Sequence, residues 1–338
     1  MTLAVLAILT FAASGCAVVN RFHVPPAVEA VPVAGGAPVR LAGTELSVVT
    51  FNIGYAGMGR DADFVLDGGK QQRPRDKRLV EDNLAAIVGW LAGADADVLL
   101  LQEVARPSFS TYGMDVLEAL SAAAPDTTWT FGPDIKTRFV PPPFRTVIGN
   151  ASFSRVEVAG AEARGLPLEP KFQFGLFRKG YRAHILRLAG PDAWTIVNVH
   201  LAAFDSVDAA IREKQLAAVL AFAQDEYLAG RHVVVGGDFN MRLVVTRFPH
   251  ATAAAHLFWI RDLLPDSVPK GWRVAADSRV PTVRTAHQPY TPAVNYTTIV
   301  DGFLLSPNVE LVDVRTEDLR FIHTDHHPVR VVVRAADR

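Results

Sequence analysis

The chain has 338 residues, of which 49% are hydrophobic and 20% are charged. This composition excludes a disordered chain, a collagen-like repeat and a coiled coil. The 34 basic and 35 acidic residues leave a net charge of -1, without the basic excess that is typical of nucleic-acid-binding modules. With one cysteine, Cys16, the chain can form neither an internal disulfide nor a cysteine zinc cluster. The length fits one large domain or two ordinary ones.

An apolar run of eleven residues, Leu3 to Ala13, is followed by two small residues and then by Cys16. Its length is typical of a signal-peptide core and is too short to span a bilayer as a helix. The cysteine after small residues resembles the bacterial lipobox, in which cleavage leaves a lipid-carrying N-terminal cysteine. The resemblance predicts a signal peptide over residues 1–16, lipidation of Cys16, and a protein exported to the cell envelope and anchored to the membrane. The alternative is a plain secretory signal, with Cys16 incidental and the protein secreted.

Residues 17–44 are rich in Val, Ala, Pro and Gly and show no helical period, which predicts a flexible tether. Residues 45–335 carry the element pattern of a folded domain. Helical spacing of apolar residues predicts one helix over 76–91. A second helix is expected to be capped by Ser206 or Asp208 and to end at Gly230. Short β-branched or apolar runs predict strands at 45–53, 97–101, 147–153, 172–177, 183–188, 194–199, 232–235, 300–305 and 329–333.

The predicted strands end, one after another, in an acid, an amide or a histidine. The residues concerned are Asn52, Gln102, Glu103, Asn198, His200, Asp238, Asn240 and Asp301, and Asp325 and His326 follow near the C-terminus. Taken singly, each has an ordinary explanation as a turn former, a helix cap or a hydrogen-bonded core histidine. The repetition is harder to explain in that way, because a buried carboxylate or imidazole is costly unless it pairs or binds a cation.

Carboxylate and amide oxygens without cysteine favour Mg²⁺, Mn²⁺ or Ca²⁺ over zinc. Two histidines beside them offer a proton donor and a proton acceptor near neutral pH. The residues alone therefore predict metal-assisted hydrolysis, with phosphorus as the expected reaction centre.

Seven motifs carry a family resemblance. They are TFNIG (50–54), LLQEV (100–104), GNASFSR (149–155), NVHL (198–201), GGDFN (236–240), VDGFL (300–304) and TDHHP (324–328). In this order they resemble the endonuclease/exonuclease/phosphatase superfamily over about residues 45–335. The stretches DADFVLDGGK (61–70) and QPYTP (288–292) also resemble those of an uncharacterised bacterial branch of it. The resemblance implies an α/β (α+β) fold of the deoxyribonuclease I type. This is a four-layer αββα sandwich, with two mainly antiparallel sheets face to face and helices outside. It also implies a metal-dependent phosphoesterase that hydrolyses a phosphodiester or phosphomonoester by in-line attack of water.

The resemblance implies a metal site. Glu103 corresponds to the principal metal ligand, and Asn52 and Asp325 correspond to residues near the same cation. The implied cofactor is Mg²⁺, with Mn²⁺ or Ca²⁺ as alternatives. Thr324 stands where the family usually has Ser, which preserves the hydroxyl.

The resemblance also implies a set of catalytic residues. Asp238 corresponds to the acid that orients or deprotonates the attacking water, and Asn240 to the amide that hydrogen-bonds the phosphoryl oxygen. His326, oriented by Asp301, and His200, facing the leaving group, complete the set. Whether Asp238 or His326 takes the proton stays open. Outside the set, Arg182 and Asn150 are expected to line the cleft, and His327 to face solvent or to pack.

The expected partner is a phosphoester substrate, either a nucleic acid, a phospholipid head group or a small phosphate ester. A secreted nuclease and a sphingomyelinase-like phospholipase both remain open. The alternative of a different class is a binding protein that keeps the fold without catalysis, which the intact set of candidate residues disfavours. The aromatic segment 139–144 would suit contact with lipid, although ordinary loop packing also explains it. The protein is expected to be a monomer that meets the membrane through its N-terminal lipid.

Overall fold

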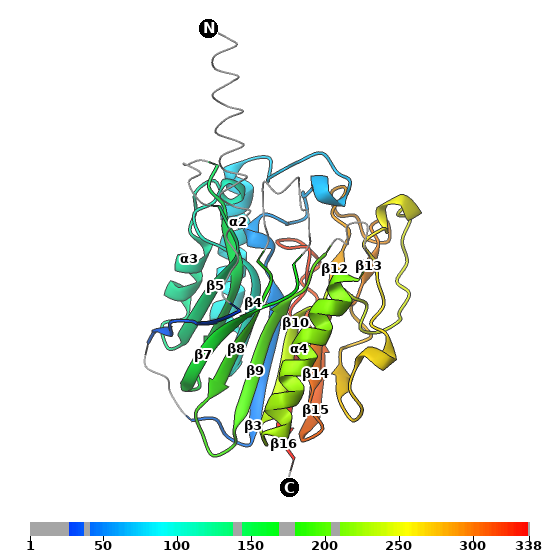
Figure 1. Ribbon diagram of the computed structural model, residues 1–338. Coiled ribbons are helices and arrows are strands. Elements are labelled where there is room, and N and C mark those ends of the chain that lie inside the picture. The colour runs from blue at the N-terminus through cyan, green and yellow to red at the C-terminus, as the bar shows by residue number, and fades with distance from the viewer. Residues whose placement is uncertain (1–26, 37–40, 138–143, 169–179, 204–209, 337–338) are drawn as a thin grey trace, which may run out of the picture.

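Two large sheets dominate the computed structural model, which describes residues 27–36, 41–137, 144–168, 180–203 and 210–336 (Figure 1). The first sheet contains, in spatial order, β1 (Val28–Ala30), β7 (Val158–Gly165), β8 (Arg182–Leu188), β9 (Trp194–His200), β10 (His232–Asp238), β14 (Asp301–Leu305) and β11 (Arg273–Ala275). The second contains β15 (Val309–Thr316), β16 (Val329–Ala335), β3 (Glu45–Asn52), β4 (Val98–Ala105), β6 (Val147–Ser154), β5 (Thr128–Lys136) and β2 (Ala34–Gly35). A small ribbon pairs β12 (Val283–Arg284) with β13 (Thr297–Thr298).

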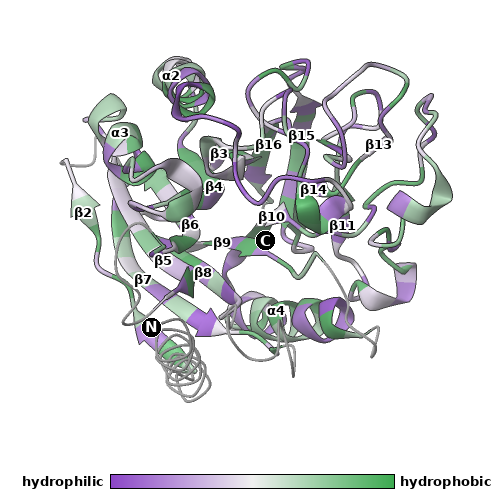
Figure 2. Ribbon diagram, turned by 90° about the horizontal axis from the view of Figure 1, so that it is seen from above, coloured by the Kyte–Doolittle hydropathy of each residue, from purple (hydrophilic) through white to green (hydrophobic). Residues whose placement is uncertain are grey.

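Helices cover the outer faces of the two sheets. The α-helices of the described residues are α2 (Lys77–Gly93), α3 (Val116–Ala123) and α4 (Ile211–Leu228). The 3-10 helices are η1 (Gly54–Ala56), η2 (Val65–Asp67), η3 (Phe109–Thr111), η5 (Ala254–His256) and η6 (Pro265–Ser267). Seen from above, α2 and α3 lie outside the sheet that holds β3 and β4, and α4 lies outside the sheet that holds β8 and β9 (Figure 2).

The apolar side chains separate into layers because side chains alternate between the two faces of a strand. On β9, Ile196 packs into the core between the sheets, whereas Val197 packs into the core beneath α4. On β4, Leu100 faces the core between the sheets and Leu101 faces the core beneath α2 and α3. The predicted four-layer sandwich is therefore confirmed.

The parallel strand pairs decide where the polar strand ends meet. Within the two sheets, β3 pairs in parallel with β4, and β9 pairs in parallel with β10. Helix α2 connects the first pair and α4 connects the second, so each is a strand–helix–strand unit. Because parallel strands end at the same edge of a sheet, the residues that follow them converge at one end of the sandwich.

Most of the predicted elements are present. The predicted helix over 76–91 is α2, and the Asp76 side chain caps it by accepting a hydrogen bond from the Leu79 N–H at 3.1 Å. The second predicted helix is α4, and Gly230 follows it with φ of 86°. The proposed caps Ser206 and Asp208, and the predicted strand 172–177, lie outside the described residues.

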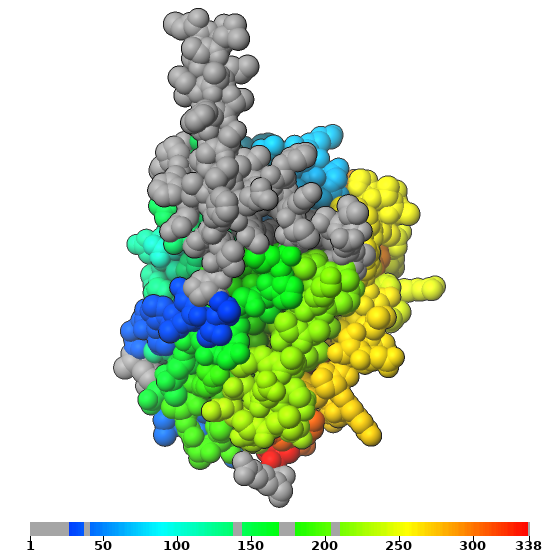
Figure 3. Space-filling view, in the orientation of Figure 1, coloured from blue at the N-terminus to red at the C-terminus, as the bar shows by residue number. Residues whose placement is uncertain are grey.

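Part of the segment predicted as a tether is strand instead. Val28–Ala30 adds to the edge of one sheet by pairing with β7, and Ala34–Gly35 adds to the edge of the other by pairing with β5. Edge strands expose unpaired N–H and C=O groups, which bind an extended segment whatever its side-chain pattern. In Figure 3 this blue segment lies on the surface beside the green strands. The tether prediction is wrong for these residues.

Among the helices of the described residues, none has the length and apolar character needed to cross a membrane.

Candidate active site

The polar residues predicted at the strand ends converge on one cavity. Its volume is about 280 Å³. The predicted site residues on its wall are Asn52, Glu103, His200, Asp238, Asn240, Asp325 and His326. Asp301 stands behind them, because it is opposite Asp238 in the register of β14 on β10. All eight residues predicted for metal binding and catalysis thus lie at this end of the sandwich.

The other two cleft predictions are wrong. Arg182 lies near the same edge of the first sheet, but its Nη1 donates to Glu29 of β1 at 2.5 Å, and the side chain is not part of the cavity wall. Asn150 is fully buried on β6 and also lies off that wall. The Arg182 side chain thus joins β8 to β1.

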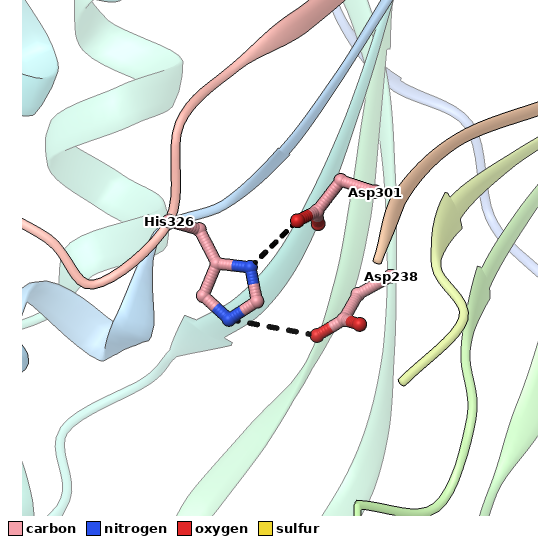
Figure 4. A group of neighbouring side chains, drawn as sticks. All are labelled: Asp238, Asp301 and His326. Carbon is pink, nitrogen blue, oxygen red and sulfur yellow. Dashed lines mark hydrogen bonds and ion pairs between the residues drawn. The ribbon is translucent and has the colours of Figure 1, made fainter. Parts of the chain in front are cut away.

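His326 lies between two carboxylates (Figure 4). Its Nδ1 is 2.9 Å from Oδ2 of Asp301, and its Nε2 is 3.7 Å from Oδ2 of Asp238. Burial disfavours the imidazolium, but the charges of Asp301 and Asp238 outweigh that cost and raise the pKa of His326 well above its usual value. The ring is therefore held as a cation with a fixed orientation.

Asp238 is the centre of the cluster. Its Oδ2 accepts from Nδ2 of Asn52 at 3.0 Å, and its Oδ1 accepts from the backbone N–H of Asn240 at 2.8 Å. Nε2 of His200 lies 3.7 Å from the same Oδ2 and 3.8 Å from Oε1 of Glu103. The Asp238 carboxylate thus contacts or faces groups from both sheets, and it lies where the strand ends of the two sheets meet.

Glu103 reaches the cavity through an irregularity in β4. The pairing of β4 with β6 shifts register between Leu101 and Val104, and Glu103 has φ of 55°. Such a bulge turns one side chain out of the regular alternation. As a result Gln102 points into the space between the sheets, where it donates to Asn198 at 2.7 Å, while Glu103 points into the cavity. Backbone strain of this kind clusters at functional sites.

Asp325 supplies a further carboxylate on the cavity wall, in addition to Glu103 and Asp238. It is 9% exposed, and its Oδ1 is buried without a hydrogen-bond partner. Burial raises the pKa of this carboxyl to about 6, against the opposing charges of His326 and Arg284. The hydroxyl of Thr324, next to it, donates to the carbonyl oxygen of Asn52 at 3.2 Å and ties this loop to the end of β3. A carboxylate oxygen without a hydrogen-bond partner here fits the binding of a cation.

The donor set suits a hard divalent cation. Glu103 and Asp325 offer carboxylate oxygens, and Asn52 offers an amide oxygen that accepts from the Gly54 N–H at 3.0 Å. Ligand atoms of Asp238, Asp301 and His326 also lie within 4.8 Å of one another, close enough to hold an ion. The hydrogen-bond distance between His326 and Asp301, however, makes that trio a better proton-bearing group than a metal site.

Comparison with known proteins identifies the family of the chain. The model of the Endonuclease/Exonuclease/phosphatase family matches residues 49–326. The chain belongs to this family. The endonuclease/exonuclease/phosphatase family consists of metal-dependent phosphoesterases, so the chain is assigned to that class of hydrolase. No curated protein matches the sequence.

Solved structures of the family share the fold at low sequence identity. An endonuclease/exonuclease/phosphatase from Beutenbergia cavernae DSM 12333 is 19% identical, with a TM-score of 0.56 over 87% of this chain and 72% of that chain. D. rerio TDP2, complexed with single-strand DNA product, is 15% identical, with a TM-score of 0.54 over 87% of this chain and 100% of its own. ANGEL2, a 2',3'-cyclic phosphatase, is 15% identical, with a TM-score of 0.55 over 90% of this chain and 98% of its own.

His327 is a packing residue, which was one of the two expectations for it. Its ring stacks on Phe321 with centroids 3.7 Å apart, and its Nδ1 is 2.8 Å from the carbonyl oxygen of Pro281. Burial lowers its pKa to about 4, so the ring is neutral at pH 7. It orders the loop that carries Asp325 and His326.

Besides Glu103, Asp238 and Asp325, the cavity wall carries two carboxylates that sequence reasoning missed, Asp134 and Asp67. Asp67 is the one whose charge interacts with that of Asp325. It ends η2, and its Oδ2 accepts from the backbone N–H of Ala286 at 2.8 Å. Burial and, to a smaller extent, the charge of Asp325 raise its pKa to about 6 against the opposing effects of this hydrogen bond and of Arg284. The segment DADFVLDGGK (61–70) was noticed only as a family resemblance, and no strand precedes Asp67 to mark it.

Asp67→Asn is expected to stabilise the metal-free protein at pH 8. Because the pKa of this carboxyl is raised in the folded state, the folded state keeps a proton between about pH 4 and pH 6 that the unfolded state has lost. The free energy of unfolding therefore falls as the pH rises through 6. The amide mimics the protonated form and removes that loss. We expect a gain of about 1–2 kcal/mol at pH 8, less than the full shift implies because the carboxyl is partly exposed, and none near pH 4.

Urea unfolding in chelator at both pH values measures this gain. Asp61→Asn, an exposed change on the same loop, serves as the control and should alter neither value. If Asp67→Asn changed the free energy of unfolding equally at pH 4 and pH 8, the ionised carboxyl would not be the cause of the lower stability at pH 8.

Proposed function

We propose that the protein is a divalent-metal-dependent phosphoesterase that hydrolyses a phosphodiester or phosphomonoester by in-line attack of water. The observation that carries the proposal is the joint placement of two kinds of groups in one cavity. The oxygen ligands Glu103 and Asp325 and the paired His326 all line the wall that Asp238 shares. Phosphoester hydrolysis needs both a cation and positioned proton-transfer groups.

Glu103, Asp325 and Asn52 would hold the cation, with Mg²⁺ as the first choice and Mn²⁺ or Ca²⁺ as alternatives. When bound, the cation would neutralise negative charge on the phosphoryl group. Asn52 also holds Asp238 through its Nδ2, so its side chain links the metal site to the catalytic carboxylate.

Asp238 would orient or deprotonate the attacking water. Its Oδ1 is held by the Asn240 backbone, and the hydrogen bonds it accepts fix the direction of the carboxylate. Asn240, with φ of 50°, donates from Nδ2 to the carbonyl oxygen of Leu201 at 2.9 Å. The amide is thereby presented at the cavity wall, where its second N–H can stabilise charge on a phosphoryl oxygen.

The two histidines would have separate tasks. His326, oriented by Asp301 at 2.9 Å, places a positive edge beside Asp238 and the phosphoryl group. His200 lies on the cavity wall at the end of β9, 3.8 Å from Glu103, where it can give a proton to the departing oxygen.

Hydrolysis of bis-p-nitrophenyl phosphate tests the proposal. We expect Mg²⁺-dependent release of p-nitrophenol that excess chelator abolishes and added Mg²⁺ restores. Full activity in chelator would eliminate the metal mechanism, and inactivity with every divalent cation would favour a binding protein that keeps the fold.

We also propose that the protein is exported and anchored in the cell envelope through a lipid on Cys16. The support is the sequence of residues 1–16, which lie outside the described residues. Mass spectrometry of the mature N-terminus is expected to show an acylated Cys16, and Cys16→Ser should leave the chain unprocessed or mislocalised. A mature chain that begins at another residue without acyl groups would favour plain secretion.

A further inference from the structure

Three exposed apolar side chains lie next to residues of the cavity wall, either in sequence or in contact. Val65, 40% exposed, precedes the wall residue Leu66, and Phe258, 50% exposed, precedes the wall residue Trp259. Phe144, 62% exposed, stacks on the wall residue Phe109 with ring centroids 5.9 Å apart. We call Val65, Phe144 and Phe258 the apolar rim.

The rim comes from segments that are far apart in sequence. Val65 belongs to η2, Phe258 lies two residues after η5, and Phe144 precedes β6. Figure 1 shows the segments of η2 (blue to cyan) and η5 (yellow) at the upper end of the sandwich, beyond the ends of β9 and β10. Single exposed apolar residues are ordinary on a protein surface, but three from separate segments beside one cavity make a candidate interaction surface.

The wall of the cavity next to the apolar rim also carries apolar side chains. Its wall includes Phe64, Leu66, Phe109, Ile135, Ile148, Trp259 and Val283. The polar and charged groups of the site stand at the strand ends, so a ligand that reaches them passes apolar side chains. Such an entry suits a substrate with an apolar part, and a polyanionic strand would instead favour a basic wall.

The start of the described chain lies at the same edge of the first sheet. The Gly165 N–H donates to the carbonyl oxygen of Ala27 at 2.9 Å, and Gly165 is opposite Arg182 in the register of β7 on β8. Arg182 lies two residues beyond the pair His184–Asn198, level with His200. Three strand spacings, about 15 Å, therefore separate Ala27 from the catalytic end of β9.

The length of the preceding chain limits how far an anchor can be. Cys16 lies eleven residues before Ala27, and a chain of that length spans at most about 40 Å in any conformation. An anchor at Cys16 would thus be joined to the folded domain at its cavity end, within about 40 Å of Ala27.

We propose that the apolar rim rests on a lipid surface, and that the phosphoester entering the cavity is carried by a lipid of that surface. The second half rests on the proposed phosphoesterase function, whereas the docking of the rim does not. Val65, Phe144 and Phe258 enter the boundary between head groups and acyl chains, and the head-group phosphate reaches the strand ends.

The test compares two triple variants in a full-length Cys16→Ser background, which removes the lipid anchor from every protein. The rim variant is Val65→Ser, Phe144→Ser and Phe258→Ser. The control variant is Leu41→Ser, Leu228→Ser and Val312→Ser, which changes equally exposed apolar residues away from the cavity. Measurements are co-flotation with vesicles of phosphatidylethanolamine and phosphatidylglycerol, release of water-soluble phosphate from them, and hydrolysis of bis-p-nitrophenyl phosphate and single-stranded DNA.

The rim variant is expected to bind vesicles and to release phosphate from them at least about tenfold less well than its parent. Its hydrolysis of bis-p-nitrophenyl phosphate should stay within about twofold, and the control variant should match the parent in every assay. Equal vesicle binding by the rim and control variants would overturn the docking surface. A selective loss of DNA hydrolysis in the rim variant would overturn it in favour of a nucleic-acid platform.

Two outcomes separate this proposal from the proposed function. A parent that hydrolyses bis-p-nitrophenyl phosphate but releases no phosphate from the vesicles would overturn the lipid substrate. A parent that hydrolyses neither would refute the phosphoesterase, while co-flotation of the rim and control variants would still decide the docking surface.

Discussion

Glu103→Gln is expected to lower Mg²⁺-dependent phosphoester hydrolysis by about a hundredfold or more. The substitution keeps the size and shape of the side chain and removes its charge. Glu103 enters the cavity at the bulge of β4 and lies with Asp325 on the same wall. If these two carboxylates hold the cation, loss of one charge weakens metal binding directly. The fold should persist, because the bulge and its strained φ depend on the backbone of β4 and β6.

Isothermal titration with Mg²⁺ provides a readout besides activity. Glu103→Gln should weaken Mg²⁺ binding, while the thermal midpoint of the metal-free protein stays within a few degrees of the parent. Glu310→Gln on β15 removes an exposed carboxylate that is not part of the cavity wall and serves as the matched control. Unchanged Mg²⁺ affinity and activity in Glu103→Gln would remove this residue from the metal site.

Much of this site could be predicted because polar residues follow buried strands in a detectable pattern. Asn52, His200 and Asp238 end strands of the two parallel pairs, and parallel strand ends meet by topology. Asp301 was expected to end a strand, but it begins β14, and it lies beside them because β14 is antiparallel to β10. A strand-end rule therefore recovers residues whose position depends on sheet register.

The same rule fails where position depends on loops and on sheet edges. Asp67 reaches the cavity from a loop, and its burial depends on contacts with Ala286, more than two hundred residues away in the chain. Arg182 lies level with His200 in the strand register, yet its side chain pairs with Glu29. Glu29 is there because the segment expected to be a tether adds a strand at that edge. No local signal in the sequence marks either contact.

Strands with mixed surfaces were also missed. β7 and β15 lie at or next to the sheet edges, are only partly buried and carry charged residues along their length. Apolar runs that mark a buried strand are therefore absent from them, and their pairing with β8 and β16 is a tertiary contact.

Replacement of the two histidines is expected to separate their roles by the substrate used. His200→Ala should strongly reduce hydrolysis of an alkyl phosphoester, by about a hundredfold, and reduce that of a p-nitrophenyl ester by much less. The alkyl leaving group needs a proton on its departing oxygen, whereas p-nitrophenolate leaves with little protonation. The position of His200 at the end of β9, on the wall with Asp238, is compatible with that delivery.

His326→Ala should impair both esters, because its Nε2 faces Asp238 and the phosphoryl side of the site. Asp301→Asn should reproduce part of this defect. Oδ2 of Asp301 holds Nδ1 of the ring at 2.9 Å, and an amide there no longer supplies the negative charge that keeps the imidazolium protonated. The pKa of His326 should therefore fall in Asp301→Asn, which a titration of its ring resonances by NMR can follow.

The comparison requires control of stability, since His326 and Asp301 are both buried. Each variant is assayed at a temperature equally far below its own thermal midpoint, and His232→Ala, a buried histidine at the start of β10, provides the matched loss of an imidazole from the fold. His232→Ala should lower both ester activities equally once stability is matched. Equal losses on the alkyl and p-nitrophenyl esters in His200→Ala would contradict the leaving-group role and reduce His200 to phosphate binding or packing. A selective loss on the alkyl ester would instead place the proton donor on β9 and the charge-stabilising ring on the loop before β16, so that the two sheets of the sandwich each supply one histidine to the reaction.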